Sequence, residues 1–491
     1  MGTAMGTALG TAMGTALIGI DIGTTSVKAV LLTLSGQRLA SYGQSYPTHR
    51  PAAGQVEQDP HVWLSHVTAA LAAFAAHANH VKAIGITSQV NTHVFAGADL
   101  APLCPALVWQ DARAADEAAA IDAAIAPADK IAWLGAPIPV DASHALARIA
   151  WMARHRPQVW SATRAVMAPK DWVIARLTGV IQADPLASVG LVGTDLRYAK
   201  ALIARVPGAA AVLPPLADPL ARAGVMQSGP FKSVPVVTGT MDAWASMVGL
   251  GVASPGQGFY LSGTSEVLGL LSPTRFPVPG VVTFPEWAGL VLHAGPTQAG
   301  GASLDWLARL TGRTTANLCT MATPITATSP LFLPHLQGER APLWDAAARG
   351  TFAGLTLASD AGVMAAAVME GVAFSARWAL EAVEASGADS PAILQAGGGG
   401  MQSDRWCQIR ADALARPLQR MRGADPGALG AAVLAGVGAG LLPDLATAAR
   451  LLLQPDRRFD PDPAASALAH QRFTLFKQLY QAARPTNAAL G

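Results

Sequence analysis

Two stretches of the chain share one pattern: an apolar run, a short polar turn and a second apolar run. They span residues 16–33 and 258–271, and their turns begin at Gly23 and Gly263. Apolar runs on both sides of a short glycine-containing turn predict β-hairpins. Because the turns lie about half the chain length apart, the repeat predicts two domains of similar plan, each with one hairpin facing a shared cleft.

The segments around these hairpins alternate between helical and strand patterns. Ala-rich helices are expected over residues 61–78 and 116–126, and short apolar strands over residues 81–87 and 234–238. Alternation of this kind predicts α/β layers. The second half continues the pattern, with helices expected at 303–310, 362–385, 405–415 and 428–440 and a strand at 392–395.

Turn-forming residues at 253–256 mark the expected domain boundary. We therefore predict an N-terminal domain over residues 17–253 and a C-terminal domain over residues 254–491. A chain of 491 residues exceeds what one hydrophobic core usually supports, which agrees with two domains. Residues 1–16 repeat Met-Gly-Thr-Ala without an amphipathic pattern, so we interpret them as a disordered leader or a misplaced start.

Composition argues against several classes of protein. The 34 Lys and Arg nearly balance the 32 Asp and Glu, without the basic run typical of nucleic-acid binding. The longest apolar run, residues 428–442, is too short for a membrane span and predicts a buried helix. The three cysteines lack metal or disulfide spacing, which favours a reducing cytoplasm. An apolar content of 51% predicts a compact globular protein and is compatible with a homodimer.

The first turn carries groups suited to a polyphosphate. Glycine lets backbone N–H groups approach phosphate oxygens closely, and hydroxyl groups add donors. Asp21 precedes the turn, where a carboxylate suits a Mg²⁺ ion between it and the phosphates. Ordinary turn chemistry and an Asx-turn are the alternatives, and recurrence of the turn later in the chain favours phosphate binding. The phosphate candidates are Gly23, Thr24, Thr25 and Ser26, with Lys28 close behind.

A glycine-rich segment and a second aspartate add to the candidate chemistry. Residues 395–400 follow a strand and precede a helix, so the bare backbone of Gly398 and Gly399 can lie against an adenine ring or a phosphate. The spacing does not fit a dinucleotide fingerprint. Asp242 follows an apolar strand and opens a helix, which capping would explain. A kinase that acts on an alcohol also needs such a carboxylate, because the hydroxyl proton must be accepted.

Six motifs stand in order along the chain, and together they resemble the FGGY carbohydrate kinases, especially xylulokinase-like members. Each motif is weak alone, whereas the ordered set is strong. The resemblance implies an α/β protein with two actin-like, ribonuclease-H-like domains that close on MgATP and a sugar. The motifs are Gly19-Ile20-Asp21-Ile22-Gly23-Thr24-Thr25, Glu57-Gln58-Asp59-Pro60, Trp109-Gln110-Asp111-Ala112-Arg113, Gly239-Thr240-Met241-Asp242-Ala243, Gly263-Thr264-Ser265 and residues 397–400.

The resemblance also implies roles for single residues. Asp242 matches the catalytic base, in a sugar-binding and catalytic N-terminal domain, while the C-terminal domain matches the nucleotide-binding one. The implied reaction moves a phosphoryl group from ATP to a hydroxyl of a ketose or polyol, such as a xylulose-like sugar. Further implied nucleotide and phosphate contacts are Gly263, Thr264, Gly301, Asp305, Gly399 and Ser403.

The expected sugar pocket departs from the family pattern at one place. Where xylulokinase-like proteins carry Gln-Met-His-Gly, this chain reads Gln89-Val90-Asn91-Thr92. The resemblance therefore does not carry D-xylulose over to this chain. Asn91 still offers a donor and an acceptor to a sugar hydroxyl. His93 is explained equally well as a structural histidine.

Three residues of another motif are candidates for the pocket wall. Trp109 can stack on the apolar face of a sugar, with Asp111 and Arg113 forming a hydrogen-bonded wall, or it can belong to the core. Asp59 is explained as a helix cap followed by proline, and Glu57 keeps a smaller claim to the pocket.

Two other functions fit the same fold. One is an actin-like or chaperone-like ATPase switch, which would need a polymer or peptide surface. The other is a catalytically silent sugar sensor, which would lack the base or the phosphate turns. Asp242 and both turns are present, and we therefore expect a cytoplasmic ATP-dependent sugar kinase.

Overall fold

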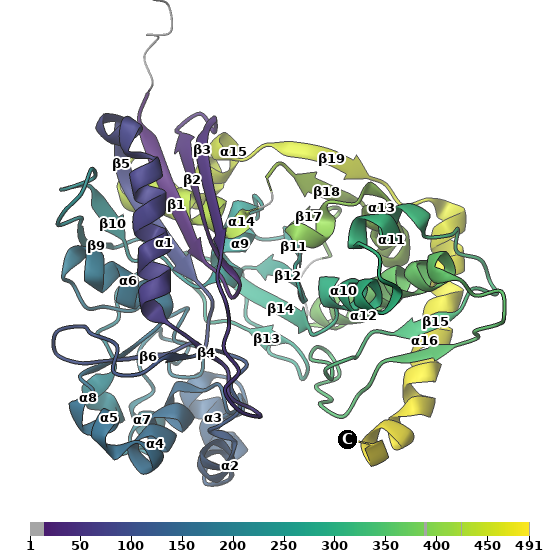
Figure 1. Cartoon of the computed structure of the whole chain (residues 1–491), viewed down its shortest axis with the longest axis horizontal. Coiled ribbons are helices and arrows are strands. Elements are labelled where there is room, and N and C mark those ends of the chain that lie inside the picture. The colour runs from purple at the N-terminus through teal and green to yellow at the C-terminus, as the bar shows by residue number, and fades with distance from the viewer. Residues whose placement is uncertain (1–13, 387–389, 424, 491) are drawn as a thin grey trace, which may run out of the picture. The chain divides into compact units, whose positions relative to one another are not determined.

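The computed structural model describes residues 14–386, 390–423 and 425–490 (Figure 1). The chain forms two units. One comprises the described part of Met1–Gly249 together with Gly427–Leu453, and the other comprises Leu250–Pro426 and Gln454–Gly491. Most of the expected leader lies outside the described residues, but Ala16 differs from that expectation because it is the fully buried first residue of a strand.

The first unit contains a six-stranded sheet of order β3-β2-β1-β5-β10-β9. Strands β1 and β2 form the first predicted hairpin, which is confirmed, and β5 and β10 run parallel to β1. Helices cover the sheet, so β1 is apolar and buried along nearly its whole length. The strands are β1 (Ala16–Ile22), β2 (Ser26–Thr33), β3 (Arg38–Ser45), β5 (Val81–Ser88), β9 (Arg222–Val225) and β10 (Pro235–Val237), with the short pairs β4 (Glu57–Gln58) with β7 (Ala106–Leu107) and β6 (Val94–Ala96) with β8 (Ala165–Met167).

Helix α1 packs against β2 and β3 and runs alongside the sheet in Figure 1. As predicted, Asp59 caps it, accepting from the backbone N–H of His61 at 2.9 Å, and proline opens it. The helices of this unit are α1 (Pro60–Ala73), α2 (Ala115–Ala123), α3 (Pro127–Leu134), α4 (Ala145–His155), α5 (Pro157–Ala162), α6 (Pro169–Thr178), α7 (Lys200–Ile203), α8 (Ala209–Val212), α9 (Asp242–Gly249), α14 (Pro426–Gly438) and α15 (Leu445–Leu452), with a 3₁₀ turn at Ala75–His80.

Residues 427–453 differ from the expected division of the chain, which placed them with the C-terminal half. Helix α14 packs on β1 and β5, where the backbones meet closely because glycine provides no side chain. A Cβ atom on Gly19 would lie 1.9 Å from the carbonyl oxygen of Ala428, and one on Gly85 would lie 2.0 Å from that of Ala431. The Gly- and Ala-rich run is a buried helix, as its composition predicted, and it completes the first unit.

The second unit repeats the plan of the first with a seven-stranded sheet of order β13-β14-β12-β11-β17-β18-β19. Strands β11 and β12 form the second predicted hairpin, which is confirmed, and β17 and β18 continue the sheet in the direction of β11. The bounds are β11 (Gly258–Ser262), β12 (Glu266–Ser272), β13 (Val282–Thr283), β14 (Val291–Thr297), β17 (Leu394–Gly397), β18 (Leu418–Met421) and β19 (Pro455–Phe459), with the separate pair β15 (Leu331–Leu333) and β16 (Thr351–Ala353).

The two sheets share a core of the same order and direction. Strands β3-β2-β1-β5-β10 correspond to β14-β12-β11-β17-β18, since each set has three antiparallel strands followed by two strands parallel to the third. The predicted duplication is therefore present at the level of sheet topology.

Helices enclose the second sheet, and α12 is its central core helix. Among the described residues α12 is the helix long and apolar enough to cross a membrane, yet 78% of that apolar window is buried inside the protein. A mostly buried helix of this kind is typical of a protein core. The helices are α10 (Gly301–Thr311), α11 (Thr315–Met321), α12 (Ala361–Ala385), α13 (Asp404–Leu414) and α16 (Pro463–Leu490), with a 3₁₀ turn at Gly399–Met401.

Candidate active site

In the first unit, two predicted site aspartates lie at one edge of the sheet. Strands β1, β5 and β10 are parallel, so their carboxyl ends meet at the same edge. Asp21 pairs in register with Thr87 of β5, whose hydroxyl donates to the carbonyl oxygen of Thr240 at 2.5 Å. Asp242 follows two residues later and opens α9. With strands spaced about 4.8 Å apart, two strand steps separate the aspartates by roughly 10 Å.

The turn after β1 holds the first group of phosphate candidates. The N–H of Gly23 donates to the carbonyl oxygen of Ser26 at 3.0 Å, which closes the turn. The Tyr46 hydroxyl donates to the carbonyl oxygen of Gly23. Thr25, at the tip, is exposed. Lys28 lies directly opposite Asp21 in the antiparallel register, so a cation and a carboxylate flank the base of the turn.

Neutral side chains form hydrogen bonds with the same turn. The Gln58 amide donates to the carbonyl oxygen of Thr24 at 2.7 Å, and the Gln89 amide donates to Gln58 at 2.9 Å. The indole N–H of Trp109 donates to the Thr24 hydroxyl at 3.0 Å. Gln89 and Gln58 are buried, and Trp109 is partly exposed. Residues predicted to bind the sugar and residues predicted to bind the phosphates are therefore joined in one hydrogen-bond network.

Asp242 combines partial exposure with a raised pKa. Its Oδ1 accepts from the N–H of Ala243 at 2.8 Å, at the start of α9. Burial raises the pKa of Asp242 from 3.8 to about 6, although backbone N–H groups act in the opposite direction. A carboxyl group with such a pKa is ionised near neutral pH and remains basic enough to take a proton in a transition state.

A buried ionic cluster lies beneath the Asp242 loop. The Thr240 hydroxyl donates to Asp184 at 2.9 Å, and Lys170 lies 2.7 Å from Asp184 and 2.5 Å from Asp171. Burial alone would lower the pKa of Lys170, but the carboxylates of Asp171 and Asp184 raise it, so the ammonium group stays charged. This cluster fixes the backbone two residues before Asp242. A Lys-Asp pair at the start of an apolar helix was the sequence signal that could have revealed it.

The predicted pocket wall is an ion cluster in which Arg113 is the centre. Its guanidinium group contacts both oxygens of Asp111, at 2.7 to 2.9 Å, and Glu57 at 2.7 Å. Asp111 also accepts from the N–H of Val56 at 2.6 Å and is buried. The hydrogen-bonding capacity of Asp111 is thus largely used inside the protein. Glu57, whose side chain is 19% exposed, is the carboxylate of this cluster that retains contact with solvent.

Asn91 and His93 have different surroundings. Asn91 has a positive φ of 50°, which asparagine tolerates better than most residues, and its amide donates to the Ser143 hydroxyl at 3.2 Å. Buried Arg148 donates to the carbonyl oxygen of Asn91 at 2.6 Å and lies 2.9 Å from the ring of His93. Burial, together with Arg148, holds the pKa of His93 well below its usual value, so the ring is neutral. These contacts support the structural reading of His93. Val90, beside Asn91, is partly exposed.

In the second unit, the turn after β11 receives the start of α10. The N–H of Gly301 donates to the carbonyl oxygen of Gly263 at 2.8 Å, and that of Ala302 donates to the carbonyl oxygen of Thr264 at 3.1 Å. Gly263 and Thr264 are exposed. Asp305 is an exposed residue of α10, one helical turn after Gly301. The predicted residues of the turn and of α10 are therefore neighbours.

The glycine-rich loop lies against the same hairpin. A Cβ atom on Gly398, which has a φ of +96°, would lie 2.3 Å from the carbonyl oxygen of Ser262, and one on Gly400 would lie 2.1 Å from its hydroxyl oxygen. Gly399 is exposed and has open space around it. Ser403 caps α13 by accepting from the N–H of Trp406 at 3.3 Å. The structure thus assembles a glycine-lined backbone surface around Ser262.

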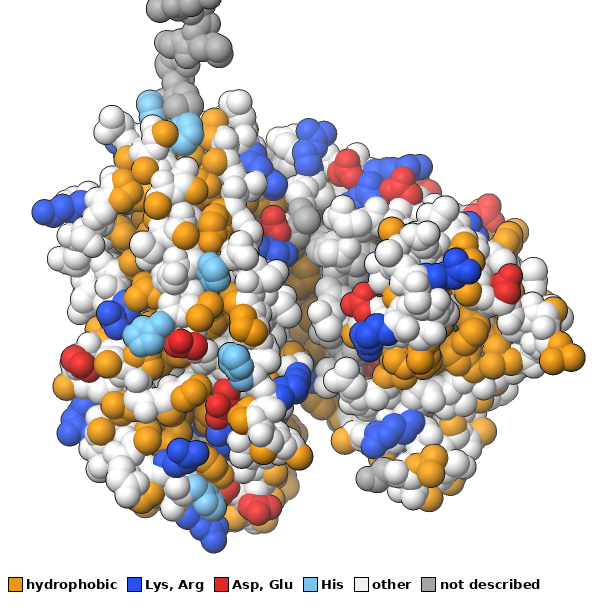
Figure 2. Space-filling view, viewed as in Figure 1, with side chains coloured by type: hydrophobic (Ala, Val, Ile, Leu, Met, Phe, Trp, Pro, Cys, Tyr) orange, Lys and Arg blue, Asp and Glu red, His pale blue; other side chains and the backbone are white. Residues whose placement is uncertain are grey.

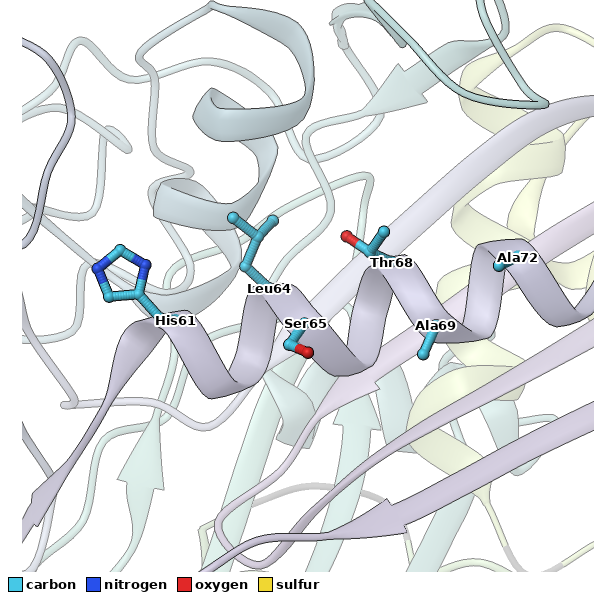
Figure 3. Close-up of a pocket in the computed structure, with 6 residues that line it drawn as sticks. All are labelled: His61, Leu64, Ser65, Thr68, Ala69 and Ala72. Carbon is cyan, nitrogen blue, oxygen red and sulfur yellow. The ribbon is translucent and has the colours of Figure 1, made fainter.

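A surface groove lies along helix α1, apart from Asp21 and Asp242. The groove is open, and Figure 3 shows that its lining side chains all come from this single helix. On the face shown in Figure 2, small apolar side chains gather over α1, and acidic and basic side chains are interspersed rather than grouped by sign. The groove has no cluster of acid and base groups. It is lined by His61, Leu64, Ser65, Thr68, Ala69 and Ala72.

Both halves of the chain match one family. Residues 16–249 match the N-terminal domain of the FGGY family of carbohydrate kinases, and residues 258–439 match its C-terminal domain. The chain belongs to the FGGY family of carbohydrate kinases. It is a sugar kinase with the two actin-like, ribonuclease-H-like domains of that family, and its substrates are ATP and a sugar.

Three relatives illustrate the range of the match. The xylulose kinase of Escherichia coli (strain K12) is 30% identical over 501 residues, covering 96% of this chain and 100% of that protein. A ligand-bound xylulose kinase from Lactobacillus acidophilus is 25% identical with a TM-score of 0.86, and a gluconate kinase from the same organism is 26% identical with the same TM-score. Each structural match covers 97% of this FGGY kinase and 100% of the other chain. The FGGY fold of this chain is thus shared by kinases named for different sugars.

Proposed function

We propose that this kinase transfers the γ-phosphoryl group of MgATP to a hydroxyl group of a ketose or polyol, with Asp242 as the general base. The observation that carries the proposal is the setting of Asp242. It sits at the carboxyl edge of the first sheet, partly exposed, with a pKa raised by burial to about 6 and with its loop fixed by a buried ionic cluster. Phosphoryl transfer demands mainly orientation and late removal of the hydroxyl proton, which a fixed carboxylate supplies.

The glycine-bearing turns are proposed to hold the nucleotide. Backbone N–H groups and hydroxyls of the turn at Gly23 and of the turn at Gly263 would contact phosphate oxygens, and the loop at Gly399 would border the nucleotide. Support comes from the exposed tips of both turns and from the open space at Gly399. Gly301 and Asp305 belong to the same nucleotide proposal. In the α10 helix the first N–H groups already bond to the hairpin, so the helix supports the turn.

Mg²⁺ is proposed at Asp21. Magnesium usually keeps several waters and binds one or two carboxylates plus substrate phosphates, so a single aspartate beside a phosphate turn fits its chemistry. Within the described ranges no three His, Cys, Asp or Glu side chains are grouped as a metal cage. That arrangement fits an ion shared with a nucleotide. The ion would neutralise charge on the phosphate oxygens, while Asp21 would orient it.

The sugar is proposed to bind near Asn91 and Trp109. The partly exposed indole offers an apolar face, Asn91 offers an amide, and the Arg113 cluster stiffens the adjoining wall. Gln89 acts through Gln58 rather than by direct contact, because its amide is buried and bonded. Closure of the two domains is part of the proposal, since transfer to sugar rather than to water requires that water be excluded. The setting we propose is the cytoplasm, with a homodimer as the assembly to test.

The test is a panel of ketoses, aldoses and polyols, each incubated with MgATP while ADP is quantified. We expect ADP release to depend on one group of related sugars and to be slow without any sugar. Sugar-independent turnover would instead support an ATPase switch, and nucleotide binding without turnover on any sugar would support a silent sensor. Size-exclusion chromatography with light scattering decides the assembly.

A further inference from the structure

The second unit contains a buried ion pair that the proposed chemistry does not use. Glu266 is the first residue of β12, directly after the phosphate turn, and Arg410 lies on α13. Both side chains are fully buried, and Arg410 Nη2 lies 2.6 Å from Glu266 Oε1. Burial alone would lower the pKa of Arg410, but Glu266 raises it, so the guanidinium group stays charged. Burying two charges is costly unless their remaining hydrogen bonds are satisfied.

The hydrogen bonds of the pair run to the two nucleotide elements and to Tyr260 of β11. Arg410 donates to the carbonyl oxygen of Gly400 at 2.7 Å and to the Ser262 hydroxyl at 2.9 Å. Glu266 accepts from the Ser262 hydroxyl at 2.6 Å and from the Tyr260 hydroxyl at 2.5 Å. Ser262 precedes the phosphate turn and Glu266 follows it, so the pair links both ends of the turn to the glycine-rich loop at Gly400.

These contacts coincide with close approaches of the glycine-rich loop to Ser262. Gly398 and Gly400 lie so near Ser262 that neither position has room for a side chain. The tips of the two segments, Gly263 and Gly399, are exposed, whereas the pair beneath them is buried. Because an arginine fork makes several directed bonds at once, it can fix the spacing of the two segments in a way that apolar packing does not.

We propose that Glu266 and Arg410 are positioning residues for the nucleotide, which set the spacing between the phosphate turn and the glycine-rich loop. They act through Ser262 and Gly400 and need not touch the nucleotide. This inference rests on the proposed function, because it takes the two segments to bind ATP. It deepens that proposal by assigning the geometry of the nucleotide site to one buried pair.

The same unit offers a matched control. Glu370 and Arg472 form a second buried pair, 2.7 Å apart, with side chains that are 3% and 2% exposed. Arg472 also donates to carbonyl oxygens of residues 326–330, so it is bonded as fully as Arg410. These hydrogen bonds of the pair do not reach the phosphate turn or the glycine-rich loop. The two pairs are therefore comparable in burial and in hydrogen bonding, and the first pair is the one that contacts the nucleotide elements.

The test compares two double variants of the full-length kinase. Glu266→Gln with Arg410→Met, and Glu370→Gln with Arg472→Met, each remove both charges, so neither leaves a buried charge unpaired. The readouts are the dissociation constant of ADP by titration with fluorescent mant-ADP, the KM for MgATP, the KM for the accepted sugar, and the midpoint of urea unfolding.

We expect the first double variant to weaken ADP binding and raise the KM for MgATP about tenfold, with the KM for sugar changed less than about twofold. The control double variant should leave ADP affinity within about twofold of wild type at a comparable unfolding midpoint. Equal effects of the two double variants on ADP, or wild-type affinity in the first, would overturn the inference. A wild-type protein that bound no ADP at all would instead refute the nucleotide assignment itself.

A milder variant covers the case in which the first double variant does not fold. Ser262→Ala removes only the hydroxyl that the two charged groups share. We expect it to weaken ADP binding about threefold while the unfolding midpoint stays close to that of wild type. Unchanged ADP affinity in this folded variant would also overturn the inference.

Discussion

Replacing Asp242 by asparagine tests the proposed general base most directly. The asparagine oxygen can still accept from the N–H of Ala243, as the carboxylate does at 2.8 Å, so the local backbone is preserved. The amide cannot take a proton from a sugar hydroxyl. A positioned general base contributes about 10²- to 10⁴-fold. We therefore expect kcat to fall by a factor in this range, with ADP affinity within about twofold of wild type.

The pH profile of the wild-type kinase tests the same residue without a mutation. Burial raises the pKa of Asp242 to about 6, and only the ionised carboxylate can act as the base. For such a pKa the base is about 90% ionised at pH 7 and about 10% ionised at pH 5. We expect kcat/KM for the sugar to fall about tenfold between these two pH values and to approach a limb of unit slope below pH 5.

Stability should change in the opposite sense to activity. A carboxyl group whose pKa is raised by folding stabilises the protein fully below its unfolded pKa, and this contribution is lost as the pH rises through about 6. Raising a pKa from 3.8 to about 6 corresponds to at most about 3 kcal/mol, and partial exposure of Asp242 reduces the effect. Asp242→Asn should therefore gain about 1–2 kcal/mol of unfolding free energy at pH 8 and almost none near pH 4.

The assay is direct quantification of ADP between pH 5 and pH 8.5, together with urea unfolding at pH 4 and pH 8. Asp195→Asn, an exposed change of the same chemistry in the same unit, is the control and should alter neither quantity. If Asp242→Asn kept kcat within threefold of wild type, Asp242 would not be the general base, and its role would be limited to the hydrogen bond at the start of α9. An acid limb below pH 4.5 would contradict the raised pKa.

Three further predictions concern packing and the sugar pocket. Gly430→Ala places a Cβ 1.7 Å from a backbone carbonyl oxygen of α9, so urea unfolding should show that the free energy of unfolding falls by more than about 2 kcal/mol. Gly43 has open space around it, and the control Gly43→Ala should leave the free energy of unfolding nearly unchanged. Arg113→Lys removes the forked guanidinium group that bonds to both Asp111 and the neighbouring glutamate. We expect the KM for the sugar to rise about tenfold while the KM for MgATP stays unchanged. Parallel rises in both KM values would indicate a general loss of structure. Asn91→His introduces the histidine of the Gln-Met-His-Gly segment. We expect the ratio of kcat/KM for D-xylulose to kcat/KM for the sugar that the wild type prefers to rise, as measured in competition assays. If the order of preference among sugars did not change, Asn91 would not determine sugar specificity.

The hairpins and most of the helices could be predicted because their signals are local. An apolar run, a glycine-threonine turn and a second apolar run define a hairpin without reference to the rest of the chain, and Asp59 before proline defines a helix start. Local patterns of this kind specify elements, and they also placed Asp21 and Asp242 at strand ends.

The remaining parts of the site depend on contacts between distant segments. Nothing in the sequence around Gln58 indicates that its side chain bonds to the turn at Thr24. The Gly- and Ala-rich sequence of α14 predicts a helix that packs closely on another element, but it does not identify the sheet on which the helix packs. A single charge within an apolar strand, as at Glu266, signals burial with a partner. It does not identify Arg410, which lies more than a hundred residues away. Sequence patterns therefore indicate candidate residues at turns and strand ends, whereas the buried partners that support these residues have no local signal.

The two supporting networks differ in chemistry but agree in net charge. In the first unit the turn is held by the neutral amides of Gln58 and Gln89, and in the second unit by Glu266 and Arg410, whose charges cancel. Neither support adds a net charge beneath its turn. Besides the proposed Mg²⁺ ion and Lys28, attraction for phosphate then comes from backbone N–H groups and hydroxyls at the exposed tips, and its strength depends on their geometry. The buried networks control this geometry. Substitutions in these networks should therefore lower nucleotide affinity even though the substituted residues do not touch the nucleotide.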